Sequence, residues 1–397
     1  MNVVYIAPVA PQSYRARHND RGYQLGGFRK AELTLEALTN NGLDVTVLSS
    51  AVTHVNRLQW RRDETETWQL PSGRTVEVRY PSTLAIRPFG SLLNAMRAPW
   101  APGRLLRDAP PDCVVSYNTY VFESLASLSI KRRCGVPILL QVEDLPLARR
   151  REYRNLKPWL DQRFWSPMLR GASGFTAVNQ SIFEVLPRDK PKRLLPGIID
   201  DRLLQIADRR RAPFADRTRT VGYFGGLASE KGVSVLLGAV DSLPEPWCLK
   251  VAGSGPLESD FEALSRARPD RLEFLGNLAG PDLFVALCSC DATLVPREAI
   301  TEGGIGVFPF KVLEYLVAET HIISTPLPPV GALDLTFAQR WDGGIPDLIQ
   351  ALQGAEAAYR DEHNRRFDAV RLARSEFSVE GTSRLLLELI ESATTST

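Results

Sequence analysis

The stretch Thr220-Val-Gly-Tyr-Phe-Gly-Gly-Leu-Ala-Ser-Glu-Lys-Gly-Val-Ser-Val-Leu-Leu-Gly-Ala-Val240 shows the pattern that decides the fold. It begins with a β-branched and aromatic run, continues through Gly225 and Gly226, and then places apolar residues at helical spacing over 233–240. This order is typical of a strand, a tight turn and a helix. Because strands that alternate with helices favour parallel sheets, the stretch indicates an α/β protein.

The same pattern repeats towards the carboxyl end of the chain. Further strands are predicted at 249–252, 272–275, 292–295 and 321–325. Gly253 and Gly255 follow the first of these strands, and Asn277 follows the second. Ligands of parallel sheets bind beyond the carboxyl ends of the strands. These turn residues, with Gly225 and Gly226, are therefore candidates for a binding site.

A first half built in the same way precedes this stretch. Its predicted strands cover 3–7, 45–48, 113–116, 137–142 and 174–178, with an edge hairpin at 68–70 and 75–79. At 397 residues the chain is too long for one ordinary core. We expect domains at 1–195 and 196–380, and a C-terminal helix and tail at 381–397 that packs back on the first. Two Rossmann-like domains with parallel sheets facing across an interdomain cleft are the predicted architecture.

Composition excludes several classes of protein. Hydrophobic residues make up 44% and charged residues 24%, a balance suited to burying two cores and staying in solution. No apolar run approaches the ~20 residues that span a bilayer, and no signal-peptide pattern is present, so we expect a cytoplasmic protein. The five cysteines are scattered, and Cys288-x-Cys290 lacks the second pair of a zinc site, so we expect reduced thiols and no metal.

Charge is distributed unevenly along the chain. Residues 1–195 hold 28 Lys and Arg against 17 Asp and Glu, a net +11, and the remainder holds 20 against 29, a net −9. A basic first half suits an anionic partner, such as a lipid headgroup or a carboxylated acceptor, and peripheral contact with the inner face of a membrane. The alternative is a solvated surface with two halves that attract each other. We expect no nucleic-acid partner. The segment from Arg149 to Arg170, with Trp159 and Trp165, could lie against an anionic membrane. Pro158 and Pro167 are expected to interrupt a continuous amphipathic helix there, which favours an arginine-capped packing helix instead.

The segment Phe308-Pro-Phe-Lys-Val-Leu-Glu-Tyr-Leu316, which follows Gly303-Gly-Ile-Gly306, carries the most chemical information. Proline favours the first position of a helix, so Pro309 predicts a helix start directly after a glycine loop. Free amides at that start and the ammonium of Lys311 would bind phosphate, and Glu314 would accept hydrogen bonds from ribose hydroxyls. The alternative is an ordinary surface ion pair between Lys311 and Glu314.

Lys231 lies in the other glycine loop, between the strand and the helix of the opening stretch. It should reach the same carboxyl-end edge, where it could hold a diphosphate. The chain has eight lysines against 40 arginines, yet one lysine falls in each of the two glycine loops. This distribution favours the interpretation that both lysines are placed in the loops for a function and do not occur there by chance.

These motifs resemble those of the family-four retaining glycosyltransferases of the GT-B fold. The resemblance runs through 26–29, 42–48, 141–144, 177–181, 196–200, 223–232, 251–256 and 309–318. It implies a nucleotide-sugar donor bound mainly by the second domain and an acceptor bound mainly by the first. Lys231 would contact the diphosphate, Glu314 the ribose, and Gly26 with Gly27 the donor phosphate and the transferred sugar.

The candidate substrate-binding set combines these loops with one histidine from the first long loop, near the expected acceptor site. It consists of His18, Gly26, Gly27, Gly225, Gly226, Lys231, Gly253, Gly255, Asn277, Phe308, Pro309, Phe310, Lys311 and Glu314. The other three histidines have no chemical neighbours in the sequence.

The implied reaction retains the configuration of the sugar by same-face attack, with a donor phosphate oxygen accepting the acceptor proton. Lys231, Lys311 and the amides after Pro309 would stabilise the charge that gathers on the leaving diphosphate, so neither a cofactor nor a metal is required. Glu143 and Asp144 stand where many members of the family carry histidine. They are candidates to act as a base or to position the acceptor, and the alternative for each is a helix cap or a hydrogen-bond acceptor.

Two departures from the family pattern keep other functions open. The family usually has arginine where this chain has Gly226, and glutamate eight positions before Glu314, where this chain has Gly306; Glu298 or Glu302 could substitute. These departures motivate a catalytically silent, glycosyltransferase-like scaffolding subunit as the alternative. A nucleotide-sugar epimerase would need paired carboxylates and histidines, and histidines are scarce. The acceptor stays open among a lipid-linked glycan, a polysaccharide and a small molecule.

Overall fold

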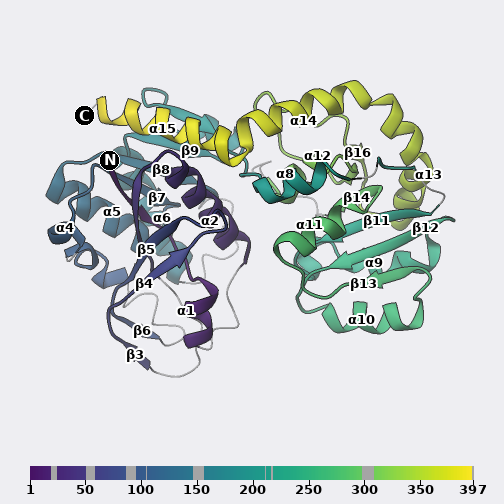
Figure 1. Ribbon diagram of the computed structural model, residues 1–397, viewed down its shortest axis with the longest axis horizontal. Helices are drawn as coiled ribbons and strands as arrows, with labels where there is room; N and C mark the ends of the chain where they lie inside the picture. The colour runs from purple at the N-terminus through teal and green to yellow at the C-terminus, as the bar shows by residue number, and fades with distance from the viewer. Residues whose placement is uncertain are drawn as a thin grey trace. The chain divides into compact units, whose positions relative to one another are not determined.

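The computed structural model describes residues 1–18, 25–50, 59–85, 95–103, 105–145, 156–210, 212–215, 218–296 and 308–395. Its contacts divide the chain into two compact units (Figure 1). Unit 1 contains Met1–Ile198 together with Val379–Thr397, and unit 2 contains Ile199–Ser378. Each unit is a predominantly parallel sheet with helices, so the predicted α/β class with two parallel-sheet domains is confirmed.

The sheet of unit 1 has eight strands in the order β10-β9-β8-β7-β1-β2-β5-β4. Its strands are β1 (Asn2–Ile6), β2 (Asp44–Leu48), β4 (Glu64–Gln69), β5 (Thr75–Tyr80), β7 (Cys113–Tyr117), β8 (Ile138–Val142), β9 (Gly174–Ala177) and β10 (Lys192–Leu194). A separate antiparallel pair joins β3 (Gln59–Arg61) to β6 (Thr83–Ala85).

The middle of this sheet is the buried part of unit 1. Val3 pairs in parallel register with Val45 on one side and with Cys113 on the other, and all three side chains are buried. Short continuous apolar runs are what a strand covered on both faces requires. At the edge, β4 pairs antiparallel with β5, which confirms the predicted hairpin.

The helices of unit 1 come from both ends of the chain. They are α1 (Gln12–Arg17), α2 (Leu25–Asn40), η1 (Ala101–Gly103), α4 (Leu105–Asp108), α5 (Val121–Cys134), α6 (Leu156–Gly171), α7 (Gln180–Val185) and α15 (Val379–Thr395). The C-terminal α15, yellow in Figure 1, packs on α2 and buries Leu386, Leu389 and Ile390. The side-chain amide of Asn41 donates to the carbonyl of Ser383 at 2.6 Å, so the contact also has a polar component.

The predicted breaks at Pro158 and Pro167 are wrong, because α6 runs through both positions. Pro158 falls in the first turn, where a backbone N–H has no helical partner to lose. Pro167 lies inside the helix. The end of the helix is well bonded, since the ammonium of Lys190 donates to the carbonyls of Leu169, Arg170 and Ala172 at 3.0, 2.9 and 2.6 Å.

Unit 2 holds a six-stranded parallel sheet in the order β13-β12-β11-β14-β15-β16. Its strands are β11 (Arg219–Phe224), β12 (Trp247–Ala252), β13 (Leu272–Phe274), β14 (Ala292–Val295), β15 (His321–Ser324) and β16 (Gln339–Arg340). Its helices are α8 (Asp201–Ala207), η3 (Ser229–Lys231), α9 (Ser234–Ala239), η4 (Val240–Ser242), α10 (Glu258–Ala267), α11 (Gly280–Cys288), α12 (Lys311–Val317), α13 (Ile345–Asp361) and α14 (His363–Phe377).

The two ends of unit 2 lie next to each other. The backbone N–H of Ile199 donates to the carbonyl of Phe377 at 2.6 Å, and Ile199 forms a parallel bridge with Ser378. Unit 2 is therefore an insertion between two parts of unit 1. No helix within the described ranges is long and apolar enough to cross a membrane.

Candidate functional site

Three glycine turns meet at the carboxyl-end edge of the unit 2 sheet, because β13, β12 and β11 are parallel neighbours. The backbone of one turn bonds the next. Gly225 N donates to the carbonyl of Ala252 at 2.9 Å, and Gly253 N donates to the carbonyl of Gly276 at 2.8 Å. Such an edge is where ligands of parallel sheets bind.

Gly253 and Gly255 are glycines because the neighbouring turn lies against them. A Cβ atom on Gly253 would lie 1.8 Å from the carbonyl oxygen of Gly225, and one on Gly255 would lie 2.4 Å from the carbonyl oxygen of Leu227. Both glycines also have a positive φ, at 156° and 155°. The two residues therefore shape the turn after β11 through its backbone.

Lys311 reaches this edge from α12. Its ammonium lies 4.0 Å from the centre of the Tyr223 ring, at the end of β11. A Cβ atom on Gly225 would lie only 2.7 Å from the ammonium nitrogen, whereas one on Gly226 would meet nothing within 4 Å. The structure thus brings Lys311 and Gly225 together and leaves open space at Gly226, the position at which the family usually has arginine.

The start of α12 differs slightly from the prediction. The helix begins at Lys311 with Phe310 in the cap position, two residues after the predicted start at Pro309. Pro309 instead accepts a hydrogen bond from Val312 N at 2.9 Å, which closes a tight turn ahead of the helix. Phe308 is buried, so an aromatic side chain anchors the chain before that turn.

The remaining candidates of unit 2 occupy different environments. Glu314 is buried on α12, so its side chain does not lie on the open surface of unit 2. Lys231 ends η3 and is exposed, and Asn277 is exposed in the turn after β13. Within the described residues, neither of these two exposed side chains makes a hydrogen bond or an ion pair. Gly303, Gly306, Glu298 and Glu302 lie outside the described residues.

Unit 1 contains a buried ion pair at the carboxyl end of β8. The Lys30 ammonium donates to Glu143 Oε2 at 2.6 Å and to the carbonyl of Leu195 at 3.0 Å. Lys30 is 6% exposed and Glu143 is 8% exposed. Burial raises the pKa of Glu143 above its ordinary value, against the opposing effect of Lys30.

The backbone around this pair is held by Asn118, which follows β7 with a φ of 59°. Its side-chain oxygen accepts hydrogen bonds from the backbone N–H groups of Glu143 and Asp144, at 3.2 and 3.3 Å. Asp144 is less buried than Glu143 and accepts a 3.5 Å hydrogen bond from the Tyr120 hydroxyl. The two acidic residues are therefore adjacent in sequence but unlike in exposure.

Gly26 and Gly27 lie in the first turn of α2, and not in a loop ahead of the helix. A Cβ atom on Gly27 would lie 3.4 Å from the Tyr117 hydroxyl, so α2 passes close to the end of β7. Burial raises the pKa of Tyr117 well above its ordinary value, with Glu143 adding to the shift. The start of α2 thus brings Gly27 close to Tyr117 and Lys30 close to Glu143, at the carboxyl ends of the neighbouring strands β7 and β8.

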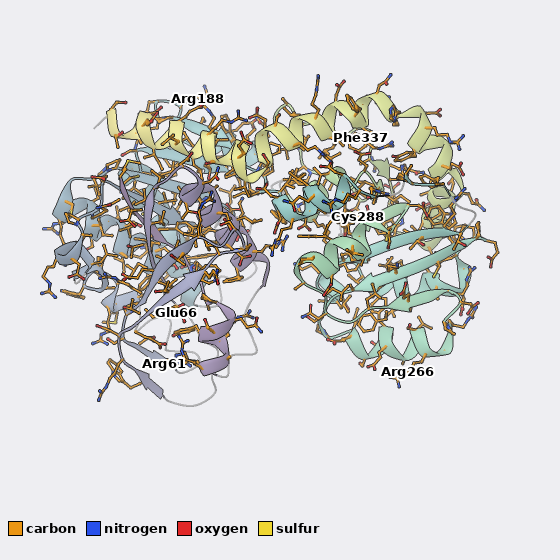
Figure 2. All side chains as sticks on the ribbon, in the orientation of Figure 1. Arg61, Glu66, Arg188, Arg266, Cys288 and Phe337 are labelled. Atoms are coloured by element: carbon orange, nitrogen blue, oxygen red, sulfur yellow. The ribbon has the colours of Figure 1, made fainter. Side chains whose placement is uncertain are left out.

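His18 belongs to a different cluster in unit 1. Its Nε2 atom lies 3.1 Å from Glu64 Oε2, and its ring centre lies 4.4 Å from that of Tyr14. Arg17 donates hydrogen bonds to both Glu64 and Glu66 at 2.6 Å; Figure 2 labels Glu66, which lies on β4. His18 is the C-cap residue of α1, so its contact with Glu64 links the end of α1 to β4.

Three residues that sequence reasoning did not single out complete these groups. Lys30 is one of the eight lysines, and its place three residues after the paired glycines Gly26 and Gly27 was a usable signal. Asn118 follows a strand, and asparagine tolerates the left-handed backbone better than most residues. Tyr223 gave no signal, because an aromatic residue in a strand usually packs in a core.

Two family models match this chain in order. A model described as glycosyl transferase 4-like domain covers residues 26–189, and one described as glycosyl transferases group 1 covers residues 218–337. The matches span 164 and 120 residues, which together make 284 of the 397.

Individual proteins extend the comparison. The chain is 26% identical to a glycogen synthase of Deinococcus radiodurans over 167 residues, which cover 41% of this chain and only 36% of that protein. A sucrose-phosphate synthase structure from Thermosynechococcus elongatus has a TM-score of 0.64 at 14% identity, with both chains covered completely. The Anabaena protein HepE, solved with UDP and glucose, has a TM-score of 0.63 at 16% identity, covering 99% of this chain and 100% of that one.

The structural likenesses show the fold, and the two family models show the family. Both halves of the pattern occur in the expected order on two parallel-sheet units, with the 4-like match in unit 1 and the group 1 match in unit 2. The chain belongs to the GT4-type, group 1 glycosyltransferases of the GT-B fold.

Proposed function

We propose that this protein transfers a sugar from a nucleoside diphosphate donor, held by unit 2, to an acceptor held by unit 1. One observation carries the proposal: the Lys311 ammonium lies against Gly225 at the carboxyl-end edge of the unit 2 sheet. A cation at that edge is suited to a ligand phosphate. The Anabaena neighbour was solved with UDP, which supports the same ligand class here.

The donor part of the proposal assigns charge stabilisation to two lysines. As the bond between sugar and phosphate breaks, negative charge gathers on the departing diphosphate. Lys311, and Lys231 from the exposed end of η3, would stabilise that charge more in the transition state than in the ground state. We propose that the reaction needs neither a cofactor nor a metal, and that the sugar keeps its configuration.

The acceptor part of the proposal separates the roles of the two acidic residues. Asp144 is the more accessible, so it is the residue proposed to contact the acceptor. Glu143 is buried against Lys30 and is proposed to hold the end of β8 in place. The basic character of residues 1–195 supports an anionic or lipid-linked acceptor and peripheral association with the cytoplasmic face of a membrane.

The first experiment measures thermal stabilisation by UDP, ADP, GDP and the corresponding nucleotide sugars. Binding to the folded state stabilises by about 2.7 kcal/mol at a ligand concentration 100 times the Kd. We expect one base series to raise the melting temperature of the wild type, and Lys311→Ala to remove most of that rise. Lys250→Ala is the matched control, since this lysine of the same unit pairs with Glu273. If no nucleotide raises the melting temperature, the proposed donor site is wrong.

The open position at Gly226 favours a second candidate, a silent relative that binds a donor without transferring its sugar. Single-turnover incubation with the stabilising nucleotide sugar and an acceptor panel distinguishes the two. Release of the nucleoside diphosphate with a new glycosidic bond supports the transferase, and NMR of the product gives the anomeric configuration. If the protein binds the nucleotide sugar but releases no nucleoside diphosphate with any acceptor of the panel, the result supports the silent relative.

A further inference from the structure

The ammonium of Lys311 is positioned by an aromatic ring. It lies 4.0 Å from the centroid of the Tyr223 ring, well inside the ~6 Å range of a cation–π interaction. Tyr223 is 1% exposed, so the core of unit 2 fixes the plane of the ring. A fixed ring face gives the flexible four-carbon stem of lysine one favoured end position.

The hydroxyl of the same tyrosine holds the neighbouring turn. Tyr223 donates a 2.8 Å hydrogen bond to the carbonyl of Gly226. One side chain therefore contacts both the ammonium of Lys311 and the backbone of the turn after β11. The turn consists of Gly225 and Gly226, and glycine has the greatest backbone freedom of all residues. The hydrogen bond from Tyr223 therefore restricts the conformation of this turn.

The helix that carries Lys311 is bonded to the same strand end. The Tyr315 hydroxyl accepts from Phe224 N at 3.1 Å and donates to the carbonyl of Phe224 at 3.3 Å. Lys311 lies four residues earlier on α12, which places it on the same face of the helix. The hydrogen bonds of Tyr315 thus fix α12 against the end of β11 and, with it, the distance between Lys311 and the Tyr223 ring.

The glycines of the turn provide the space that this arrangement needs. Gly225 has no side chain to displace the ammonium, whose nitrogen would be 2.7 Å from a Cβ atom at that position. Gly226 is exposed and has nothing within 4 Å of its own Cβ position. A diphosphate can therefore approach beside the ammonium without meeting a side chain of Gly226.

We propose that Tyr223 is a positioning residue for the diphosphate of the donor: its ring holds the Lys311 ammonium, and its hydroxyl holds the turn beside it. The inference rests on the proposed function. Holding the lysine in its binding position before the ligand arrives reduces the ordering that binding must supply. Tyr223 itself has no contact with the ligand in this arrangement: its ring acts through Lys311 and its hydroxyl through the turn after β11.

The test is calorimetric titration of the nucleoside diphosphate that stabilises the wild type, and of its nucleoside. Tyr223→Met keeps an apolar side chain of similar length but has no ring face, and Tyr223→Phe keeps the ring without the hydroxyl. We expect Tyr223→Met to weaken diphosphate binding by about 3- to 10-fold, and Lys311→Met by about 10- to 100-fold. The nucleoside should bind both variants within about 2-fold of the wild type, because it has no charge for Lys311 to meet.

The double variant decides whether the two residues act together. Tyr223→Phe and Tyr223→Met both lack the hydroxyl, so the difference between them isolates the ring. If the ring acts through the ammonium, Tyr223→Met binds the diphosphate as well as Tyr223→Phe once Lys311 is methionine. Tyr223→Phe should retain the greater part of wild-type affinity. If Tyr223→Met loses as much affinity relative to Tyr223→Phe with Lys311 replaced as with Lys311 present, the inference is overturned. No loss from Tyr223→Met when Lys311 is present overturns it too, and either result leaves the donor site intact. A wild type that binds no nucleoside diphosphate overturns the proposed function as well.

NMR provides a measurement that needs no folded variant of Tyr223. The chain has eight lysines, so 13Cε-lysine labelling gives few signals, and Lys311→Met assigns the one of interest. Methylene protons held over a ring face resonate upfield, and we expect this of Lys311 in the free and the diphosphate-bound protein. A Lys311 signal at the position of an exposed lysine in both states overturns the inference.

Discussion

Replacing Lys30 by methionine should destabilise unit 1 in a way that depends on pH. Methionine fills most of the volume of lysine but leaves Glu143 buried with no cation at 2.6 Å and the carbonyl of Leu195 without its 3.0 Å bond. Breaking a buried ion pair at one partner costs about 3–5 kcal/mol. Since Glu143 can take up a proton instead of staying charged, the cost at pH 7 should be near the lower figure.

The pH dependence follows from the pKa of Glu143. Burial already raises that pKa, and Lys30 opposes the shift, so removing Lys30 raises the pKa further. A carboxyl whose pKa is higher in the folded state favours the unfolded protein increasingly as the pH rises above its unfolded value. The loss of unfolding free energy caused by Lys30→Met should therefore be larger at pH 7 than at pH 5.

Urea unfolding of the full chain at pH 5, 6 and 7 measures this effect. Lys190→Met is the matched control, because its ammonium bonds three backbone carbonyls and its loss should depend little on pH over this range. The double variant Lys30→Met with Glu143→Met should recover most of the stability, since apolar replacement of a buried pair is often neutral. A loss for Lys30→Met that is equal at pH 5 and pH 7 would refute the reasoning.

Two further predictions concern unit 2. Gly253→Ala should lower the free energy of unfolding by more than about 3 kcal/mol and weaken nucleoside diphosphate binding, because its Cβ atom would lie 1.8 Å from the carbonyl oxygen of Gly225. Gly226→Ala is the control, since its Cβ atom would meet nothing within 4 Å. Similar melting temperatures for the two variants would contradict the prediction. Burial lowers the pKa of His321 to about 4, with Arg366 adding to the shift and a 2.7 Å bond to Gln339 opposing it. Below pH 6.5 the unfolded chain binds a proton that the folded unit does not, so stability should fall by roughly 3 kcal/mol as the pH falls to 4. His321→Asn should flatten this dependence in urea unfolding at pH 7 and pH 4.5, and an unchanged slope would count against it.

The sheets of both units could be predicted because their signals are local. Each predicted strand is a short apolar run, and each glycine turn follows directly in the chain, so neighbouring residues contain the information. Parallel pairing then places the turns of β11, β12 and β13 at one edge without any knowledge of side-chain contacts. The same reasoning led to Lys311, which lies in α12 beside a glycine-rich segment.

The partners of those residues could not be predicted, because they come from distant parts of the chain. Lys30 and Glu143 are 113 residues apart, and the tyrosine that bonds Phe224 is 91 residues further on. Glu143 was recognised as a strand-end carboxylate, but only the fold shows that a lysine from α2 neutralises it. The continuity of α6 through Pro167 was missed for a related reason: tertiary packing can outweigh the local cost of a proline.

The return of the last helix to unit 1 determines the order in which the protein can fold as it leaves the ribosome. Residues 1–198 emerge first, yet the face of α2 that α15 covers stays empty until residues 379–395 have been made. Unit 2 is continuous in the chain, and its ends meet through Ile199 and Phe377. It can therefore fold before unit 1 has received its last helix. A nascent chain halted just before α15 would therefore expose on unit 1 the face of α2 that Leu386, Leu389 and Ile390 of α15 otherwise cover.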